Sequence, residues 1–251
     1  MEIPFQVNER TLDGGAASGG LVTGPIEQTS AGLADLRALL RYWLLPADLI
    51  PGNLGLDAGF KAPTGEEALH NGGGFAHDVS VQTGTGSWDA MFGLHGFLRL
   101  GPFVPHASVR YLMTPQEKNG TPAFHAQLID SNTDVENSVP DQVSWRVGTW
   151  LDAGRLLRER FTEEEVGLAD RLRLALEVAG SHVLKRDLIG GSDGFRRAFD
   201  AVFLEPGLEW GVSERFSIYA SVPFTVYRYL STEPGTFPEV QVNVGMAFAI
   251  N

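Results

Sequence analysis

The sequence has no cysteine, no long apolar run and no excess of positive charge. Because none of the 251 residues is cysteine, disulfides, thiolate metal sites and thiol catalysis are excluded. No apolar run approaches the roughly 20 residues that a membrane-spanning helix needs, which excludes a helical membrane protein. The formal net charge of −12 argues against nucleic acid as a partner, because phosphate binding requires a basic surface.

Glycine, proline and aromatic residues are plentiful by comparison. Apolar residues make up 43% of the chain, which is too many for a disordered protein. The 30 glycines, the 14 prolines and the aromatic content of 10% suit a protein of many turns and strands. No change of composition along residues 1–251 marks a domain boundary, so we expect one large β domain.

The last twelve residues show the clearest periodicity. From Val240 to Asn251, apolar side chains alternate with small or polar ones without a break. Successive side chains of a strand point to opposite faces, so this segment predicts a strand with one apolar face. That face would hold Val240, Val242, Val244, Met246, Phe248 and Ile250.

The same alternation recurs along the chain and predicts an all-β fold, an antiparallel transmembrane β-barrel with about ten strands. Strands of about 9–11 residues with this pattern cross outer membranes in closed barrels. Short and long connections alternate, as they do between the two rims of such a barrel. Only 154–170 breaks this rule, and we expect a small helix there. The predicted strands cover residues 3–7, 36–44, 54–62, 90–100, 103–111, 143–151, 172–178, 202–210, 216–227 and 240–250.

Several short motifs carry a resemblance to a known family. They are Gly32-Leu33-Ala34-Asp35-Leu36, Lys61-Ala62-Pro63-Thr64-Gly65, Gly84-Thr85-Gly86-Ser87-Trp88-Asp89, the related turns 167–171 and 211–215, and Ser221-Val222-Pro223-Phe224. Over nearly the whole chain, the sequence resembles the outer-membrane β-barrel family of phenol-degradation (MetA-type pathway) transporters. The resemblance implies an outer-membrane location and the passage of small solutes, including aromatic or hydrophobic ones. It implies no catalytic residue.

The N-terminal segment departs from that family. Family members carry a signal peptide and further strands before the segment that resembles 3–7, whereas residues 1–5 lack the basic start of a secretory signal. We therefore expect an intact protein of twelve strands, whose signal peptide and first hairpin are missing here. Asn251 also replaces the usual terminal aromatic residue. We expect Ile3–Val7 to pair with Val240–Ile250 and to close only the outer half of the barrel.

If the apolar faces meet lipid, the opposite faces line the lumen. Their charges form either a salt-bridged network that stiffens the barrel or a path for solutes. The short turn 46–52 aligns Arg41 with Asp57, and we predict an ion pair between them. The predicted lumen-lining residues are Arg37, Arg41, Asp57, His95, Arg99, His106, Arg110, Arg146, Glu177, Glu205, Glu209, Tyr219 and Tyr227.

Charge of each sign is expected to gather along the lumen. The negative stretch could hold a hard cation, although ion pairing with Arg173 is the favoured interpretation. His70 and His77 lack further ligands at suitable spacing, so no metal site is predicted. The positive stretch comprises Arg99, Arg110 and Arg146, and the negative stretch comprises Glu177, Glu205 and Glu209.

The favoured function is a passive outer-membrane channel or transporter-like barrel, with small solutes and outer-membrane lipid as partners and without cofactors. One alternative is an outer-membrane lipid hydrolase or protease. His182 beside Ser181 would suit it, but no acidic partner for the histidine is evident and the histidines are scattered. The second alternative is a soluble ligand-binding barrel, in which the apolar faces would point inward.

Overall fold

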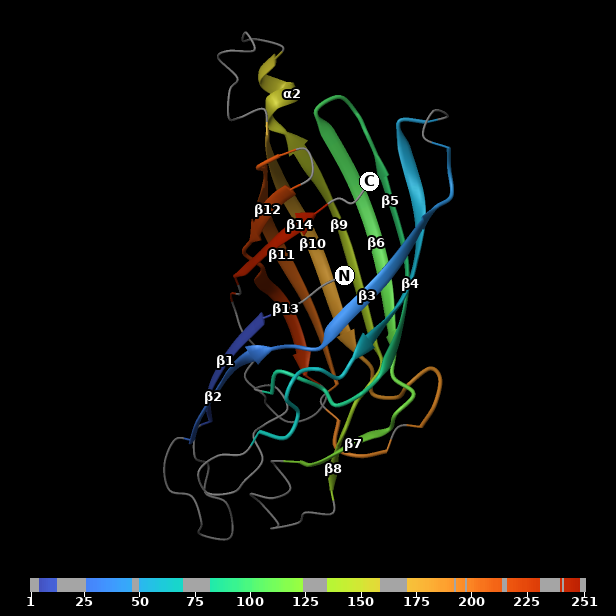
Figure 1. Cartoon of the computed structure of the whole chain (residues 1–251), viewed down its shortest axis with the longest axis vertical. Helices are drawn as coiled ribbons and strands as arrows, with labels where there is room; N and C mark the ends of the chain where they lie inside the picture. Colours follow the sequence, from blue (N-terminus) through green and yellow to red (C-terminus); the bar gives the residue numbers. More distant parts are fainter. Residues whose placement is uncertain are drawn as a thin grey trace.

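The computed structural model describes residues 5–12, 26–46, 50–69, 82–123, 135–158, 171–191, 193–196, 198–213, 216–230, 240 and 242–248. Nearly all the regular structure in these residues is antiparallel strand, with one short helix, α2 (Ala153–Arg158). Figure 1 shows a tall sheet that curls into a half-barrel. The all-β prediction is therefore confirmed. We call the end with the hairpin turns and α2 the turn rim, and the opposite end the loop rim.

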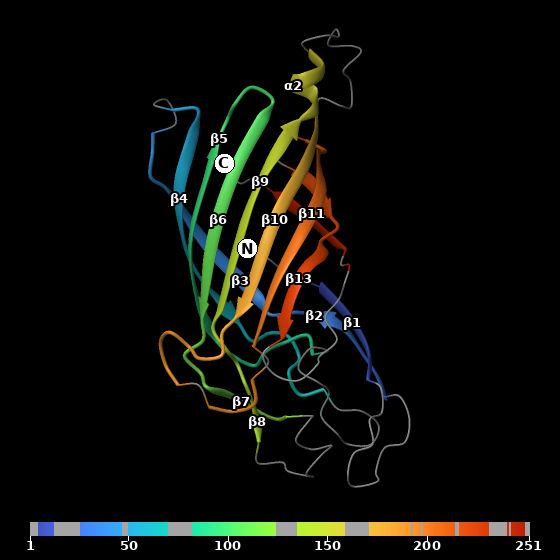
Figure 2. The same cartoon turned by 180° about the vertical axis from the view of Figure 1, so that it is seen from behind.

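The main sheet has ten strands in the order β14-β12-β11-β10-β9-β6-β5-β4-β3, with β13 paired to β11. Within the described residues, β3 and β14 are its two outermost strands. Figure 2 shows its back, where the long strands β6, β9, β10 and β11 run side by side. The strands are β3 (Leu36–Trp43), β4 (Gly52–Ala62), β5 (Asp89–Leu98), β6 (Phe103–Met113), β9 (Gln142–Asp152), β10 (Leu172–Val183), β11 (Phe199–Gly211), β12 (Phe216–Ser221), β13 (Phe224–Leu230) and β14 (Asn243–Phe248).

Burial in this sheet is the reverse of that in a water-soluble protein. Leu56 and Leu176 are 47% and 54% exposed, while their chain neighbours Asp57 and Glu177 are buried. Among the described residues, the buried apolar ones are mostly alanines, and they form no large apolar core inside the curl. Val242 and Val244 are each 71% exposed, as the outward prediction requires, and the Met246 side chain lies outside the described residues. The apolar face of the sheet is therefore its outer face.

One β-bulge changes which face a predicted residue occupies. Thr225 stands opposite Phe203, but Tyr227 stands opposite Val202, so Val226 is the extra residue on β13. Directly opposed residues share a face, and Val202 belongs to the outer face. The prediction that Tyr227 lines the lumen is therefore wrong, because simple alternation fails across a bulge.

The N-terminal strand pairs differently from our expectation. β1 (Phe5–Leu12) forms a separate two-stranded sheet with β2 (Ile26–Leu33), in which Phe5 stands opposite Leu33. The expected seam between Ile3–Val7 and β14 is therefore not formed by the described residues of those segments. The predicted strands also omitted β2, because this polar stretch lacks clear alternation and becomes a strand by pairing with β1. A second small sheet joins β7 (Lys118–Pro122) to β8 (Glu136–Ser138) at the loop rim (Figure 1).

The predicted helix is present at the start of its segment, within the described residues. α2 spans Ala153–Arg158 and begins directly after β9, where the Asp152 carboxylate accepts a hydrogen bond from the Arg155 N–H at 3.0 Å. This is the interaction of a helix N-cap residue. The rest of the segment, residues 159–170, lies outside the described residues.

Candidate functional site

The inner wall of the half-barrel carries the predicted ion pair. Arg41 on β3 stands opposite Asp57 on β4. The Arg41 Nε and Nη2 groups donate to the two Asp57 oxygens at 2.9 and 3.1 Å. This two-pronged geometry is the strongest form of guanidinium–carboxylate contact. The predicted register of the β3–β4 hairpin and its cross-strand pair are both confirmed.

A second cluster on the same wall draws its residues from β6, β9, β10, β11 and β12. Arg146 on β9 donates to Glu177 on β10 at 2.7 Å and contacts Glu205 on β11 at 3.1 Å. His106 Nε2 lies 3.0 Å from the other oxygen of Glu177, and the Ser221 hydroxyl donates to Glu205 at 2.5 Å. We call Arg41, Asp57, Arg146, Glu177 and Glu205 the wall network.

Glycines let these side chains lie flat against the wall. Glu177 stands opposite Gly148, where an added Cβ would come within 2.6 Å of Glu177 Cγ and of the Leu176 carbonyl oxygen. His95 lies in the same way over Gly55, where an added Cβ would come within 2.4 Å of the imidazole ring. Because glycine has no Cβ, the large side chains of Glu177 and His95 have room to lie along the wall.

A cavity of about 480 Å³ lies against this wall. Its lining extends from Arg41 on β3, through Arg110 on β6 and Arg146 on β9, to Asn243 on β14. Because β3 and β14 are the outermost described strands of the sheet, the curl brings opposite ends of the sheet around one space. Arg41, Asp57, Arg146 and Glu205 thus border a half-open, mostly polar cavity on the concave side of the sheet.

A second cavity of about 730 Å³ lies toward the turn rim. It shares Arg41 and His95 with the first cavity and is also lined by Arg99, His106 and Glu209. Arg173 lies 3.6 Å from Glu209, as the sequence argument favoured for one of the three glutamates. The two cavities together follow the concave face from mid-sheet to the turn rim.

The structure brings most of the predicted lumen residues to this face but does not separate their charges. The predicted positive and negative stretches are interleaved, because Arg146 pairs with both Glu177 and Glu205. Arg146 lies on β9 and its two partners lie on β10 and β11, the next two strands of the sheet. Of the remaining predicted residues, Arg37 stands opposite Lys61 and Tyr219 stands opposite Glu209, both on the inner face.

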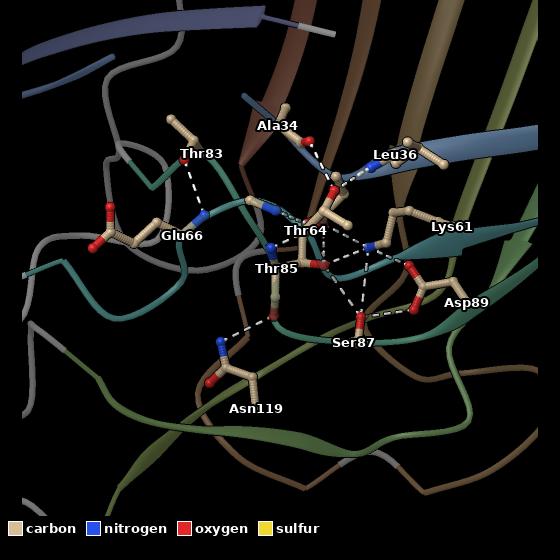
Figure 3. Close-up of polar contacts among 12 residues, drawn as sticks. Ala34, Leu36, Lys61, Thr64, Glu66, Thr83, Thr85, Ser87, Asp89 and Asn119 are labelled. Atoms are coloured by element: carbon tan, nitrogen blue, oxygen red, sulfur yellow. Dashed lines mark hydrogen bonds and ion pairs between the residues drawn. The ribbon is translucent and has the colours of Figure 1, made fainter. Parts of the chain in front are cut away.

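The loop rim holds a different cluster, in which Lys61 points toward Asp89, Thr85 and Ser87 (Figure 3). Lys61 contacts Asp89 and lies 3.4 Å from Asp35. Its Nζ also donates to the Thr85 hydroxyl and lies 3.5 Å from that of Ser87. All three charged residues are buried. We call these five residues the rim network.

The rim network joins three motifs that the sequence placed far apart. Asp35 accepts hydrogen bonds from the backbone N–H groups of Gly65 and Thr85, at 3.1 and 3.0 Å. It therefore ties the start of β3 to the connections that follow β4 and precede β5. Strand alternation puts Asp35, Lys61 and Asp89 on the polar face but does not predict this role. The signal was present, since all three belong to the motifs that carry the family resemblance.

A further buried cluster holds the neighbouring part of the loop rim. Asp141 accepts hydrogen bonds from the Tyr111 hydroxyl and from the Thr114 and Leu188 N–H groups. Arg196 pairs with Asp187 at 2.7 Å, and Asp187 accepts the Asp141 N–H at 2.8 Å. Tyr111 ends a predicted strand, whereas the other residues of this cluster belong to no predicted strand. The sequence did not reveal the partners of Asp141, which lie 27 to 47 positions away.

On the outer face, His182 has an acidic partner that the sequence argument missed. His182 Nδ1 lies 2.8 Å from Asp200, its direct cross-strand neighbour. The Trp145 indole N–H donates to His182 Nε2 at 2.8 Å. That bond occupies the nitrogen that would otherwise accept a proton from a nucleophile. Ser181 follows the opposite parity and bonds Gln142 on the inner face.

Neither metal ligands nor a spanning helix can be assigned in the described part of the chain. No group of three or more His, Asp or Glu residues there could hold a metal ion. The described helix is too short and too polar to cross a membrane. His70 and His77 lie outside the described residues. Searches against protein-family models and against curated proteins found no match for this chain.

Proposed function

We propose that this protein is an outer-membrane channel that lets small solutes cross passively along the concave face of its sheet. The observation that carries the proposal is the reversed burial, with leucines and valines exposed outside and ionic side chains buried inside. In water, such an outer face would be a large apolar patch that favours aggregation. Against lipid tails, the same leucines and valines would contact an apolar medium, as the outward-facing residues of membrane barrels do.

Strand length and aromatic placement support the same proposal. Strands β4, β5, β6, β9 and β10 have 10 to 12 residues, close to the 9–11 that a tilted strand needs to cross a bilayer. Exposed aromatic residues lie near both ends of the outer face, with Tyr42 and Trp210 toward the turn rim and Trp88 and Tyr229 toward the loop rim. Aromatic residues favour the two interfaces of a membrane.

The two alternative functions fit the geometry less well. A soluble ligand-binding barrel would place its apolar side chains inside, whereas here they are outside. A hydrolase centred on His182 would need a free Nε2, and that atom accepts the Trp145 N–H. The family resemblance adds the expectation that small aromatic or hydrophobic molecules are among the solutes.

The test is to refold the full chain in detergent, insert it into liposomes and measure the rate at which solutes cause swelling. We expect a heat-modifiable band on gels, and swelling rates that fall as solute size increases. A matched sample inserted after irreversible heat denaturation is the control. A chain that folds and stays monomeric in buffer without detergent would contradict the proposal, as would liposomes that swell no faster than the control.

A further inference from the structure

The acidic and basic members of the wall network differ in their access to the cavity. The side chains of Asp57, Glu177 and Glu205 are only 4–5% exposed, whereas those of Arg41 and Arg146 are each 45% exposed. The carboxylates lie against the wall and are covered by the arginines that pair with them. The accessible surface is therefore cationic, although the formal charges of the five residues nearly balance.

Arg110 adds a third guanidinium group to the same space. It lines the cavity and stands opposite Gly93 on β5 and Ser144 on β9. Among the residues that the structure describes, no carboxylate lies within ion-pair distance of it. Because it forms no ion pair with a described residue, its guanidinium can offer N–H donors to a ligand, unlike that of Arg146, which already serves two glutamates.

We propose that the 480 Å³ cavity binds a small organic carboxylate, with Arg110 as its main contact. A guanidinium group offers two parallel N–H donors that match the two oxygens of a carboxylate. The cavity volume falls within the range of about 300–1,000 Å³ that is usual for ligand pockets. This inference rests on the proposed function, because the binding site would lie on the path that solutes take through the channel.

Uncharged polar groups around the arginines complete the site. Ser108, Ser144 and Asn243 also line the cavity and supply hydroxyl and amide donors. No lysine lines it. The acidic residues that reach it, Asp57 and Glu205, already accept bonds from Arg41, Arg146 and Ser221. A bound carboxylate would therefore meet the hydrogen-bond donors of the arginines, serines and Asn243. The acceptor oxygens of Asp57 and Glu205 are already hydrogen-bonded to other groups.

The experiment is equilibrium dialysis of the folded full chain in detergent micelles, with benzoate and its uncharged isostere benzamide as probes. We expect benzoate to bind and benzamide to bind at least about tenfold more weakly, because only benzoate gains the charged hydrogen bonds. The Arg110→Ala variant should lose about tenfold or more in benzoate affinity. The matched control is Arg186→Ala, which removes the same charge from an exposed position after β10 and should bind benzoate like the parent chain.

Folding is checked separately by heat modifiability. If Arg110→Ala does not fold, Arg110→Lys serves instead, because it keeps the charge but loses the paired donors; its benzoate affinity should fall several-fold. Equal binding of benzoate and benzamide, or equal losses in the Arg110 and Arg186 variants, would overturn the carboxylate site. Liposome swelling is read independently. Benzoate binding without swelling would refute the channel and leave the site, and swelling without benzoate binding would do the reverse.

Discussion

The rim network and the wall network contain similar charged residues but differ in what water can reach. In the rim network, Lys61 and its two aspartates are all buried, and hydroxyl groups complete the cluster. In the wall network, the carboxylates are buried while Arg41 and Arg146 remain nearly half exposed. The rim network can therefore stabilise only the fold, whereas the arginines of the wall network can also contact a solute.

The choice of cation explains part of this difference. A lysine ammonium is a compact point charge, which two aspartates and two hydroxyls can enclose at the end of β4. An arginine is longer, and its planar group can bind a carboxylate along one edge while the other edge stays open. We therefore expect substitutions in the rim network to cost more stability than substitutions in the wall network. Each of the following variants tests this comparison.

The largest effect should come from Lys61→Met. It leaves Asp35 and Asp89 buried without their cation, and breaking a buried pair in this way costs about 3–5 kcal/mol. Urea unfolding in micelles would measure the loss. The control is Lys118→Met, at an exposed position of β7, which should change stability very little. An equally small effect at Lys61 would mean that the rim network does not hold the loop rim together.

Glu177→Gln should have the next largest effect. The substitution keeps the shape of the side chain but removes a buried charge that Arg146 and His106 contact at 2.7 and 3.0 Å. Hydrogen bonds to charged groups contribute about 1.5–3 kcal/mol, and we expect the lower part of this range because Arg146 is half exposed. Glu209→Gln, whose partner Arg173 lies at 3.6 Å, is the matched control. Unfolding midpoints that shift equally in the two variants would contradict the expectation.

Gly148→Ala tests whether the wall residues need the space that glycine leaves. The new Cβ would meet the Leu176 carbonyl oxygen at 2.6 Å, and backbone cannot move aside as easily as a side chain. Overpacking of this kind costs about 1–3 kcal/mol. At Gly96, the nearest atom to an added Cβ is the flexible Leu54 Cδ1 at 3.3 Å, so Gly96→Ala is the control. Equal denaturant stability of the two variants would show that the wall relaxes freely.

The smallest effect concerns the coupling between Arg41 and Asp57. A double-mutant cycle with Arg41→Ala and Asp57→Ala should give about 0.2–1 kcal/mol, because Arg41 is 45% exposed and solvent screens the pair. The coupling should also decrease as salt is added. A coupling energy that is several times larger and independent of salt would place this pair with the rim network and remove the distinction between the two regions.

Sequence reasoning succeeded where the structure depends on neighbouring residues. Alternation located the main strands and their apolar faces, and the short turn 46–52 was enough to align Arg41 with Asp57. It failed at Tyr227, because a single extra residue on β13 reverses the side on which later residues lie. It also missed β2, whose polar residues show no clear alternation.

The candidate site was predictable in its composition but not in its contacts. The inner-face arginines and glutamates followed from parity, yet the partners of Arg146 did not. Glu177 lies 31 positions from it in sequence, and the two residues meet only because β9 and β10 are neighbours. The acidic partner of His182 was missed for the same reason, since Asp200 lies across the β10–β11 pair.

The sequence by itself determined that the chain forms amphipathic strands and which side chains share a face, because side-chain direction in a strand has a period of two residues. Only the tertiary structure decided which charges are covered and which stay accessible. That outcome depends on the curl of the sheet, which brings β3 and β14 around one cavity, and on the loop-rim contacts that bury Lys61. The energy of burying a charge is set by all the groups around it, and these come from distant parts of the chain.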